Sequence, residues 1–177
     1  VARRKRQEQL LRALPHLEPG VTLLFVGIDE RDLAREESPP IDERHRVIFC
    51  GRVPPEEALD HYGLLTLYVL PSTIEGLSQS ILEAMAFGIP VVATRAGGNE
   101  DLIRDGENGH LFEDGDVRGL AAVIRRVLER PAERAVIIEN ARRTATETYS
   151  LARTLDAYED LFKRLISQQS ARPAEAS

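Results

Sequence analysis

Five short apolar runs, rich in β-branched residues, divide the chain, and each ends at or near turn-forming residues. They cover residues 21–26, 47–50, 65–70, 91–94 and 110–112. The runs are almost continuously apolar, as strands are when helices cover both faces of their sheet. Polar or helically periodic segments separate them. This alternation predicts a mostly parallel sheet in a three-layer α/β/α, Rossmann-like fold.

Helical periodicity and end signals place helices between and after these strands. They are predicted over residues 4–14, 54–61, 79–87, 117–128, 132–146 and 151–166. Ser78 is predicted as the N-cap of the 79–87 helix and Gly88 as its C′ residue. The last helix carries an apolar face that indicates packing rather than membrane attachment: Tyr158, Leu161, Phe162 and Leu165. Residues 167–177 have nothing to bury and are predicted to be a disordered tail.

Composition limits the class of protein. A chain of 177 residues, with 42% hydrophobic and 29% charged residues, has room for one globular domain, which we expect over residues 1–166. No apolar run approaches the roughly 20 residues that cross a bilayer, and the net charge of -6 argues against binding nucleic acid or anionic lipid. The single cysteine, Cys50, lies in an apolar run and is predicted to be a small buried hydrophobe. One cysteine cannot form an internal disulfide, which fits a cytoplasmic protein.

Glycine occurs in each loop that follows one of the first four predicted strands. These loops cover residues 27–29, 51–53, 72–76 and 95–98. In an open parallel sheet, ligands bind beyond the carboxyl ends of the strands, where backbone can approach closely and helix N-termini attract anions. The loops therefore indicate a phosphorylated ligand.

Two glutamates stand eight positions apart in this region. Glu75 lies in a loop after a strand, and Glu83 lies in the second turn of the following helix, whose side chains lean back toward the loops. A carboxylate repels phosphate but accepts hydrogen bonds from hydroxyls. The pair therefore fits a nucleotide sugar, with the ribose at one carboxylate and a hexose at the other. Glutamates near helix starts are also common simply because they favour the helix dipole, so spacing alone leaves both interpretations open.

An ordered series of short motifs runs from residue 46 to residue 112. The motifs are Val47-Ile48-Phe49-Cys50-Gly51-Arg52-Val53, Leu70-Pro71-Ser72, Glu75-Gly76, Leu82-Glu83-Ala84-Met85-Ala86, Gly88-Ile89-Pro90-Val91-Val92-Ala93-Thr94, Gly97-Gly98-Asn99-Glu100 and Asp105-Gly106-Glu107-Asn108-Gly109. Each is weak alone, but in this order they are highly specific. The stretch resembles the C-terminal, donor-binding domain of retaining glycosyltransferases of the GT-B fold, family 4 (glycosyl transferases group 1).

The resemblance implies a role for each matching position. Glu75 would lie against the transferred sugar as the catalytic residue, and Glu83 would bind the ribose hydroxyls. The remaining donor-binding groups would be the backbone N–H groups of Gly76, Leu77, Ser78 and Gln79, the loop at Arg52 and Val53 beside the base, and Lys5 at the diphosphate. The implied activity is a hexosyltransferase of carbohydrate biosynthesis that retains the anomeric configuration, with neither a cofactor nor an essential metal.

Two departures limit the resemblance. Many members carry an aromatic residue and a glycine where this chain has Leu77 and Ser78, so the donor sugar stays open. The resemblance also implies a first strand and a phosphate-binding arginine before Val1. It further implies an N-terminal domain that binds the acceptor, whether a glycan, a lipid or a small molecule. We therefore expect the chain to be part of a longer enzyme, inactive alone, and any peripheral contact with the inner face of a membrane to occur through that other domain.

Other interpretations stay beside this one. Asp114-Gly115-Asp116 could suggest a metal site, but Asp-Gly is typical of turns and Asp116 is predicted as an N-cap. The histidines show no ligand spacing. A non-catalytic domain that binds nucleotide sugars, or that only mediates contacts, is the main alternative function. A sugar-nucleotide epimerase or a phosphorylase is disfavoured by the 75–86 signature.

Overall fold

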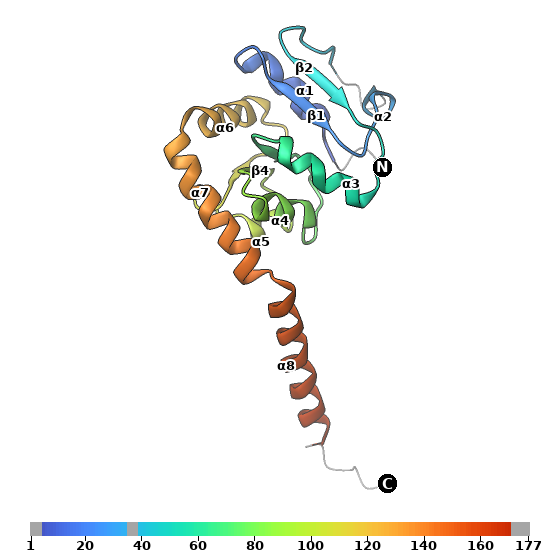
Figure 1. The fold of residues 1–177 in the computed structure, drawn as a ribbon, viewed down its shortest axis with the longest axis vertical. Helices are drawn as coiled ribbons and strands as arrows, with labels where there is room; N and C mark the ends of the chain where they lie inside the picture. The colour runs from blue at the N-terminus through green and yellow to red at the C-terminus, as the bar shows by residue number, and fades with distance from the viewer. Residues whose placement is uncertain (1–4, 35–38, 171–177) are drawn as a thin grey trace.

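The computed structural model describes residues 5–34 and 39–170 (Figure 1). The strands are β1 Thr22–Phe25, β2 Arg46–Phe49, β3 Tyr68–Leu70, β4 Val91–Thr94 and β5 His110–Phe112. The α-helices are α1 Glu8–Ala13, α2 Glu30–Ala34, α3 Pro55–Asp60, α4 Gln79–Ala86, α5 Asn99–Leu102, α6 Val117–Glu129, α7 Pro131–Arg143 and α8 Leu151–Ser170. The 3-10 helices η2 Leu14–His16 and η3 His61–Leu64 and the π-helix η4 Thr144–Thr148 complete the order.

The strands form two parallel sheets. In the first, β1 pairs with β2, and in the second the order is β3-β4-β5. Every pairing is parallel, as the continuous apolar runs predict. Within the described residues no ladder joins β1 to β3, so the sheet expected to be single is divided at that point.

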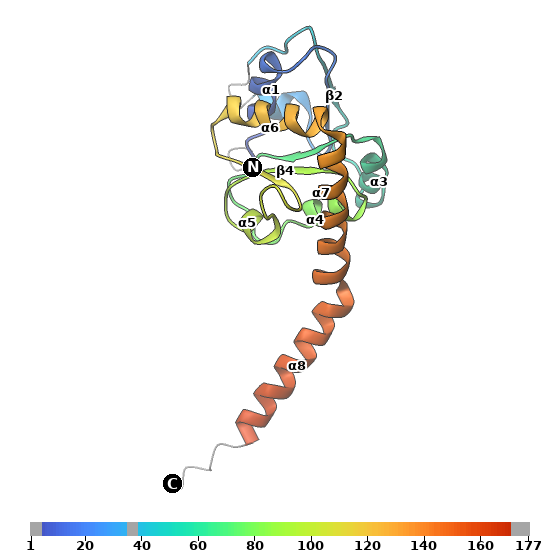
Figure 2. The same cartoon turned by 90° about the vertical axis from the view of Figure 1, so that its left-hand side faces the viewer.

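Side-chain alternation along β4 shows how the layers pack. Val92 belongs to an apolar cluster with α1 and α6, whereas Val91 and Ala93 belong to a second cluster with α4 and α7. Successive residues of a strand point to opposite faces, so helices cover both faces of this sheet. Figure 2 shows α1 and α6 on one side of β4, and α4 and α5 on the other. The three-layer α/β/α arrangement is therefore confirmed.

Most predicted elements lie where the sequence places them, and the exceptions are short or at element ends. The first helix begins at Glu8, later than predicted, and the start expected at residue 4 lies outside the described residues. The third strand begins only at Tyr68. Residues 65–67, which follow η3, have no ladder partner within the described residues. The helices α2 and α5 were not predicted.

The last helix, α8, extends away from the body of the domain (Figures 1 and 2). Its predicted packing face is exposed, with Tyr158 at 55%, Phe162 at 58% and Leu165 at 50%. The expectation of intramolecular packing is therefore wrong for this structure, since the body of the domain ends before the apolar face begins. The tail predicted from residue 167 is also wrong at its start, because α8 continues to Ser170. Residues 171–177 lie outside the described part.

Two smaller predictions concern burial and membrane crossing. Cys50 is partly exposed rather than buried, because it follows β2 at the sheet edge where the chain turns toward Gly51. No helix within the described residues is long and apolar enough to cross a bilayer.

Candidate functional site

The loops after β1 and β2 are joined by backbone hydrogen bonds. The N–H of Gly27 donates to the carbonyl of Gly51 at 2.7 Å, and the N–H of Gly51 donates to the carbonyl of Ile28 at 3.1 Å. Both glycines adopt positive φ, +92° and +64°, which side chains rarely tolerate. Two of the four predicted glycine loops thus form one backbone surface at the carboxyl end of their sheet.

The loops after β3 and β4 approach each other still more closely. The N–H of Gly98 donates to the carbonyl of Glu75 at 2.9 Å. A Cβ at Gly98 would lie 1.6 Å from the carbonyl oxygen of Gly76, and one at Gly97 would lie 2.8 Å from that of Glu75. Neither distance is possible between real atoms, so both positions require glycine. The Gly97-Gly98 loop therefore supports the backbone that carries Glu75.

The carboxylate of Glu75 pairs with the side chain of Lys5. The distance between Lys5 Nζ and Glu75 Oε1 is 2.6 Å, across 70 positions of sequence. The glutamate side chain is 15% exposed and that of the lysine 45%. Because its lysine end is exposed to water, such a pair contributes at most about 1 kcal/mol to stability, and an ammonium group has further N–H donors to offer. A ligand could therefore bind Lys5 without unfolding the site.

Lys5 is held in place by its neighbours in the chain. The buried amide of Gln9 donates from Nε2 to Asp114 Oδ1 at 2.9 Å and accepts from the N–H of Gly115 at 2.8 Å. Arg6 Nη2 also lies 3.4 Å from Asp114 Oδ1. The turn after β5 thereby anchors the start of α1, and Lys5 directly precedes this anchored segment.

The N-terminus of α4 offers unpaired backbone donors. Within the described residues, the N–H groups of Gly76, Leu77, Ser78 and Gln79 donate no hydrogen bond to the protein. Ser78 occupies the N-cap position as predicted, but its side chain makes no capping bond. Its Oγ lies 3.1 Å from Oγ of Ser80 instead. These amides and the positive end of the helix dipole together suit an anion.

Glu83 is turned toward a residue that sequence reasoning did not predict. The hydroxyl of Tyr62 donates to Glu83 Oε2 at 2.9 Å. Tyr62 lies in η3 and is 8% exposed. Nothing in the sequence distinguished this tyrosine from other core aromatics, because only the fold brings η3 beside α4.

Arg52 and Val53 follow β2 at the joined glycine loops. Arg52 is exposed and forms no ion pair or hydrogen bond with any residue that the structure describes. Lys5, Glu75 and the amides from Gly76 to Gln79 are thus brought together directly. Arg52 and Val53 follow a strand at its carboxyl end but form no hydrogen bond or ion pair with these groups within the described residues.

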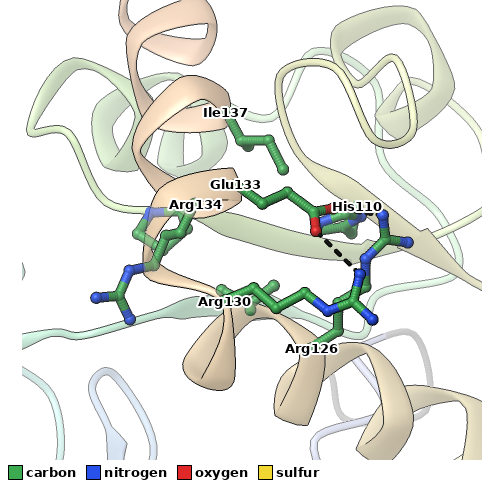
Figure 3. A pocket seen from close by; sticks show the side chains of 8 residues that line it. His110, Arg126, Arg130, Glu133, Arg134 and Ile137 are labelled. Carbon is green, nitrogen blue, oxygen red and sulfur yellow. Dashed lines mark hydrogen bonds and ion pairs between the residues drawn. The ribbon is translucent and has the colours of Figure 1, made fainter.

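A narrow pocket lies at the opposite ends of the strands (Figure 3). Its free volume of about 10 Å³ is the least that a single water molecule needs. The Glu133 carboxylate lies between Arg126 and Arg130, 3.3 Å from Nη1 of Arg130, while Arg134 points away. Burial, reinforced by the nearby Arg126, lowers the pKa of His110. The cations facing the pocket already have a counterion, so a structural role explains them.

Asp114 and Asp116 both have partners within the protein. Within the described residues, no three histidine, cysteine or acidic side chains gather in a way that could hold a metal ion. Asp116 caps α6 by accepting from the N–H of Gly119 at 2.8 Å, so its predicted role is confirmed. Asp114 is bound by Gln9 and Arg6, as described above.

Comparison with known proteins assigns the family. A family described as "Glycosyl transferases group 1" matches residues 1–144. The chain belongs to this family. Both the resemblance found in the sequence and the GT-B type of fold are confirmed.

Individual relatives show the same likeness. The chain is 32% identical over 156 residues to a lipopolysaccharide core biosynthesis glycosyltransferase, LpsE, of Rhizobium meliloti, covering 88% of this chain and 45% of that protein. It is 33% identical over 144 residues to the sulfoquinovosyl transferase SQD2 of Arabidopsis thaliana, covering 80% of this chain and 28% of that protein. The chain thus spans less than half the length of these curated relatives.

Solved structures also match the fold. Sucrose-phosphate synthase from Thermosynechococcus elongatus superposes with a TM-score of 0.78 at 28% identity, covering 94% of this chain and 43% of that one. HepE from Anabaena, solved in complex with UDP-glucose, gives a TM-score of 0.70 at 29% identity, covering 89% of this chain and 46% of that one.

Proposed function

We propose that this chain is the donor-binding domain of a glycosyltransferase and binds a nucleoside diphosphate sugar at the carboxyl ends of its strands. The observation that carries the proposal is the meeting of Lys5, Glu75 and the unpaired amides from Gly76 to Gln79 at one place. A cation and four N–H donors suit a diphosphate, and carboxylates suit hydroxyl groups. The complexes of HepE with UDP and UDP-glucose support the choice of ligand.

Each group then has a role in the proposed complex. The amides from Gly76 to Gln79 and Lys5 bind the diphosphate, Glu75 accepts from the sugar, and Glu83 accepts from the ribose. Arg52 and Val53 border the base. As the bond between the sugar and the diphosphate breaks, negative charge grows on the phosphate oxygens, and preformed donors there lower the barrier. Retention of configuration without an essential metal is part of the same proposal.

Acceptor binding is assigned to a further domain. The described residues include the groups proposed to bind the nucleotide-sugar donor, whereas the relatives are more than twice as long as the matched region. We therefore propose that the chain alone transfers little sugar. A cytoplasmic location, with any membrane contact through that further domain, belongs to the same proposal.

Calorimetric titration of the 177-residue chain tests the donor proposal. UDP, GDP and ADP are each added, followed by their glucose or mannose conjugates, and adenosine without phosphate is the control. Saturable binding of at least one diphosphate, and not of the nucleoside, is expected. Absence of binding to every diphosphate would contradict the proposal.

A non-catalytic binding domain is separated from an enzyme by turnover. In any longer protein that contains this chain, Glu75→Ala should abolish consumption of the nucleotide sugar while the protein stays folded. A protein with a non-catalytic binding domain would consume no nucleotide sugar, either as the wild type or as the Glu75→Ala variant.

A further inference from the structure

Tyr62 holds one oxygen of Glu83. Its hydroxyl lies 2.9 Å from Glu83 Oε2 and also 3.3 Å from the carbonyl oxygen of Ser80. The tyrosine side chain is 8% exposed, so water competes little for this bond. Glu83 Oε1 makes no hydrogen bond within the part of the chain that the structure describes. One oxygen is therefore committed to the protein and the other is left for a ligand.

The tyrosine ring is fixed independently of Glu83. It stacks on Phe87 with a centroid distance of 5.3 Å and an interplanar angle of 15°, and it packs against Tyr68 at 6.0 Å and 44°. Tyr62 also belongs to the buried cluster that contains Ile81 and Met85 of α4. Because packing sets the position of the phenol, the phenol can determine where the carboxylate lies.

The hydrogen bond between Tyr62 and Glu83 has a defined direction, with the phenol as the donor. Burial, together with the hydrogen bond to Glu83, raises the pKa of Tyr62. The phenol consequently keeps its proton and donates it to the hydrogen bond, and Glu83 accepts as a carboxylate. The free oxygen of Glu83 is then an acceptor as well.

We propose that Tyr62 is a positioning residue that fixes Glu83 so that its free oxygen accepts from a ribose hydroxyl, which makes the site selective for ribonucleotides. The inference rests on the proposed donor function. A site that is built to hydrogen-bond a hydroxyl rejects an analogue lacking it, because the acceptor is left unpaired. An unanchored carboxylate can turn toward water, and that selectivity is then lost.

Replacement of Tyr62 by phenylalanine provides the test, because Tyr62→Phe removes one oxygen atom and keeps the stacked ring. The dissociation constants of UDP, 2′-deoxy-UDP and 3′-deoxy-UDP are measured by calorimetry on the 177-residue chain, with GDP and its deoxy forms as a second set. Tyr158→Phe makes the same change on the exposed face of α8 and serves as the matched control. Thermal melting checks that both variants fold.

Wild type and Tyr158→Phe should bind UDP or GDP about tenfold more tightly than at least one deoxy form. In Tyr62→Phe this ratio should fall to within about twofold, through weaker binding of the ribonucleotide alone. In a Glu83→Gln background, Tyr62→Phe should change the ratio no further.

Three results would overturn the inference. In the first, Tyr62→Phe weakens binding of the ribonucleotide and of its deoxy forms equally, which indicates only a packing role. In the second, the ratio of their dissociation constants is unchanged in Tyr62→Phe. In the third, wild type itself binds the ribonucleotide and its deoxy forms equally. If wild type binds none of UDP, GDP and ADP, the donor proposal fails first, and this inference fails with it.

Discussion

At the scale of single residues, the ion pair between Lys5 and Glu75 joins two side chains with different proposed roles. Lys5 is proposed to bind the diphosphate, and Glu75 is proposed to bind the sugar. The two groups lie 2.6 Å apart although no local sequence pattern links them. A lysine beside the diphosphate would place its carboxylate partner, Glu75, beside the sugar. The pair thus places cation and acceptor at adjoining parts of one ligand.

Removal of the Lys5 charge should weaken diphosphate binding. Lys5→Met is expected to raise the dissociation constant of UDP or GDP about 10- to 100-fold, because a hydrogen bond to a charged group is worth about 1.5–3 kcal/mol. Lys163→Met is the matched control, since Lys163 also forms an exposed ion pair, with Glu159 at 2.6 Å, but on α8. Equal affinities for the two variants would remove Lys5 from the site.

His110 should make stability depend on pH. Its pKa in the folded chain lies below the ordinary value of 6.5, so the unfolded chain takes up a proton first as the pH falls. The contribution is therefore fully present above pH 6.5 and is lost as the pH falls from 6.5 toward the folded pKa. Between pH 7.5 and 5.5, melting temperature should fall more in wild type than in His110→Gln. The exposed His16, changed to Gln, is the matched control, and identical slopes in wild type and His110→Gln would refute the assignment.

At the scale of elements, the approach of two loops shapes the site. The β4–α5 loop can support the β3–α4 loop only because Gly98 lacks a side chain, since a Cβ there would lie 1.6 Å from the carbonyl oxygen of Gly76. The site therefore depends on the β4–α5 loop, although no side chain of this loop is proposed to bind the ligand.

Gly98→Ala tests this dependence. The variant should lose about 1–3 kcal/mol of unfolding free energy through overpacking, and its affinity for UDP or GDP should fall because the Glu75 loop must move. Gly63→Ala is the control, because a Cβ at Gly63 meets no atom within 4 Å and φ there is not positive. Thermal melting and calorimetry on both variants give the comparison. Tolerance of alanine at position 98 in both measurements would show that the loops can separate freely.

Sequence patterns predicted elements well where the pattern was long or sharply bounded. The bounds of β4 and β5 were predicted to the residue, and α6 to within one residue, because turn residues or a cap enclose an apolar run or stripe. The helices α2 and α5, of five and four residues, are too short to display periodicity. The contacts of Glu75 with Lys5 and of Glu83 with Tyr62 could not be predicted, since they join segments 70 and 21 positions apart.

At the scale of the whole molecule, the main feature to explain is the division of the strands into two sheets. Val21 and Phe25 present their carbonyls to β2, so alternation places the N–H groups of Thr22 and Leu24 on the other edge of β1. We propose that a further parallel strand fits between β1 and β3, as the family resemblance implies. Such a strand would pair with the edges of β1 and β3 that have no partner within the described residues.

Hydrogen exchange of the monomeric chain examines this proposal. The amides of Thr22 and Leu24 should exchange much faster than those of Leu23 and Phe25, which face β2. Slow exchange at all four positions without an added segment would show that the edge is already paired.

We propose above all that a nucleoside diphosphate binds where Glu75, Lys5 and the start of α4 meet. The most direct test of this proposal is an amide ¹H–¹⁵N NMR titration of the 177-residue chain with UDP and GDP. The signals of Gly76 to Gln79 and of Gly98 should shift saturably with a diphosphate and stay fixed with the nucleoside alone. Contradiction would come from unmoved signals at these residues while others shift, for example those of Arg126, Arg130 and Glu133 at the opposite end of the strands.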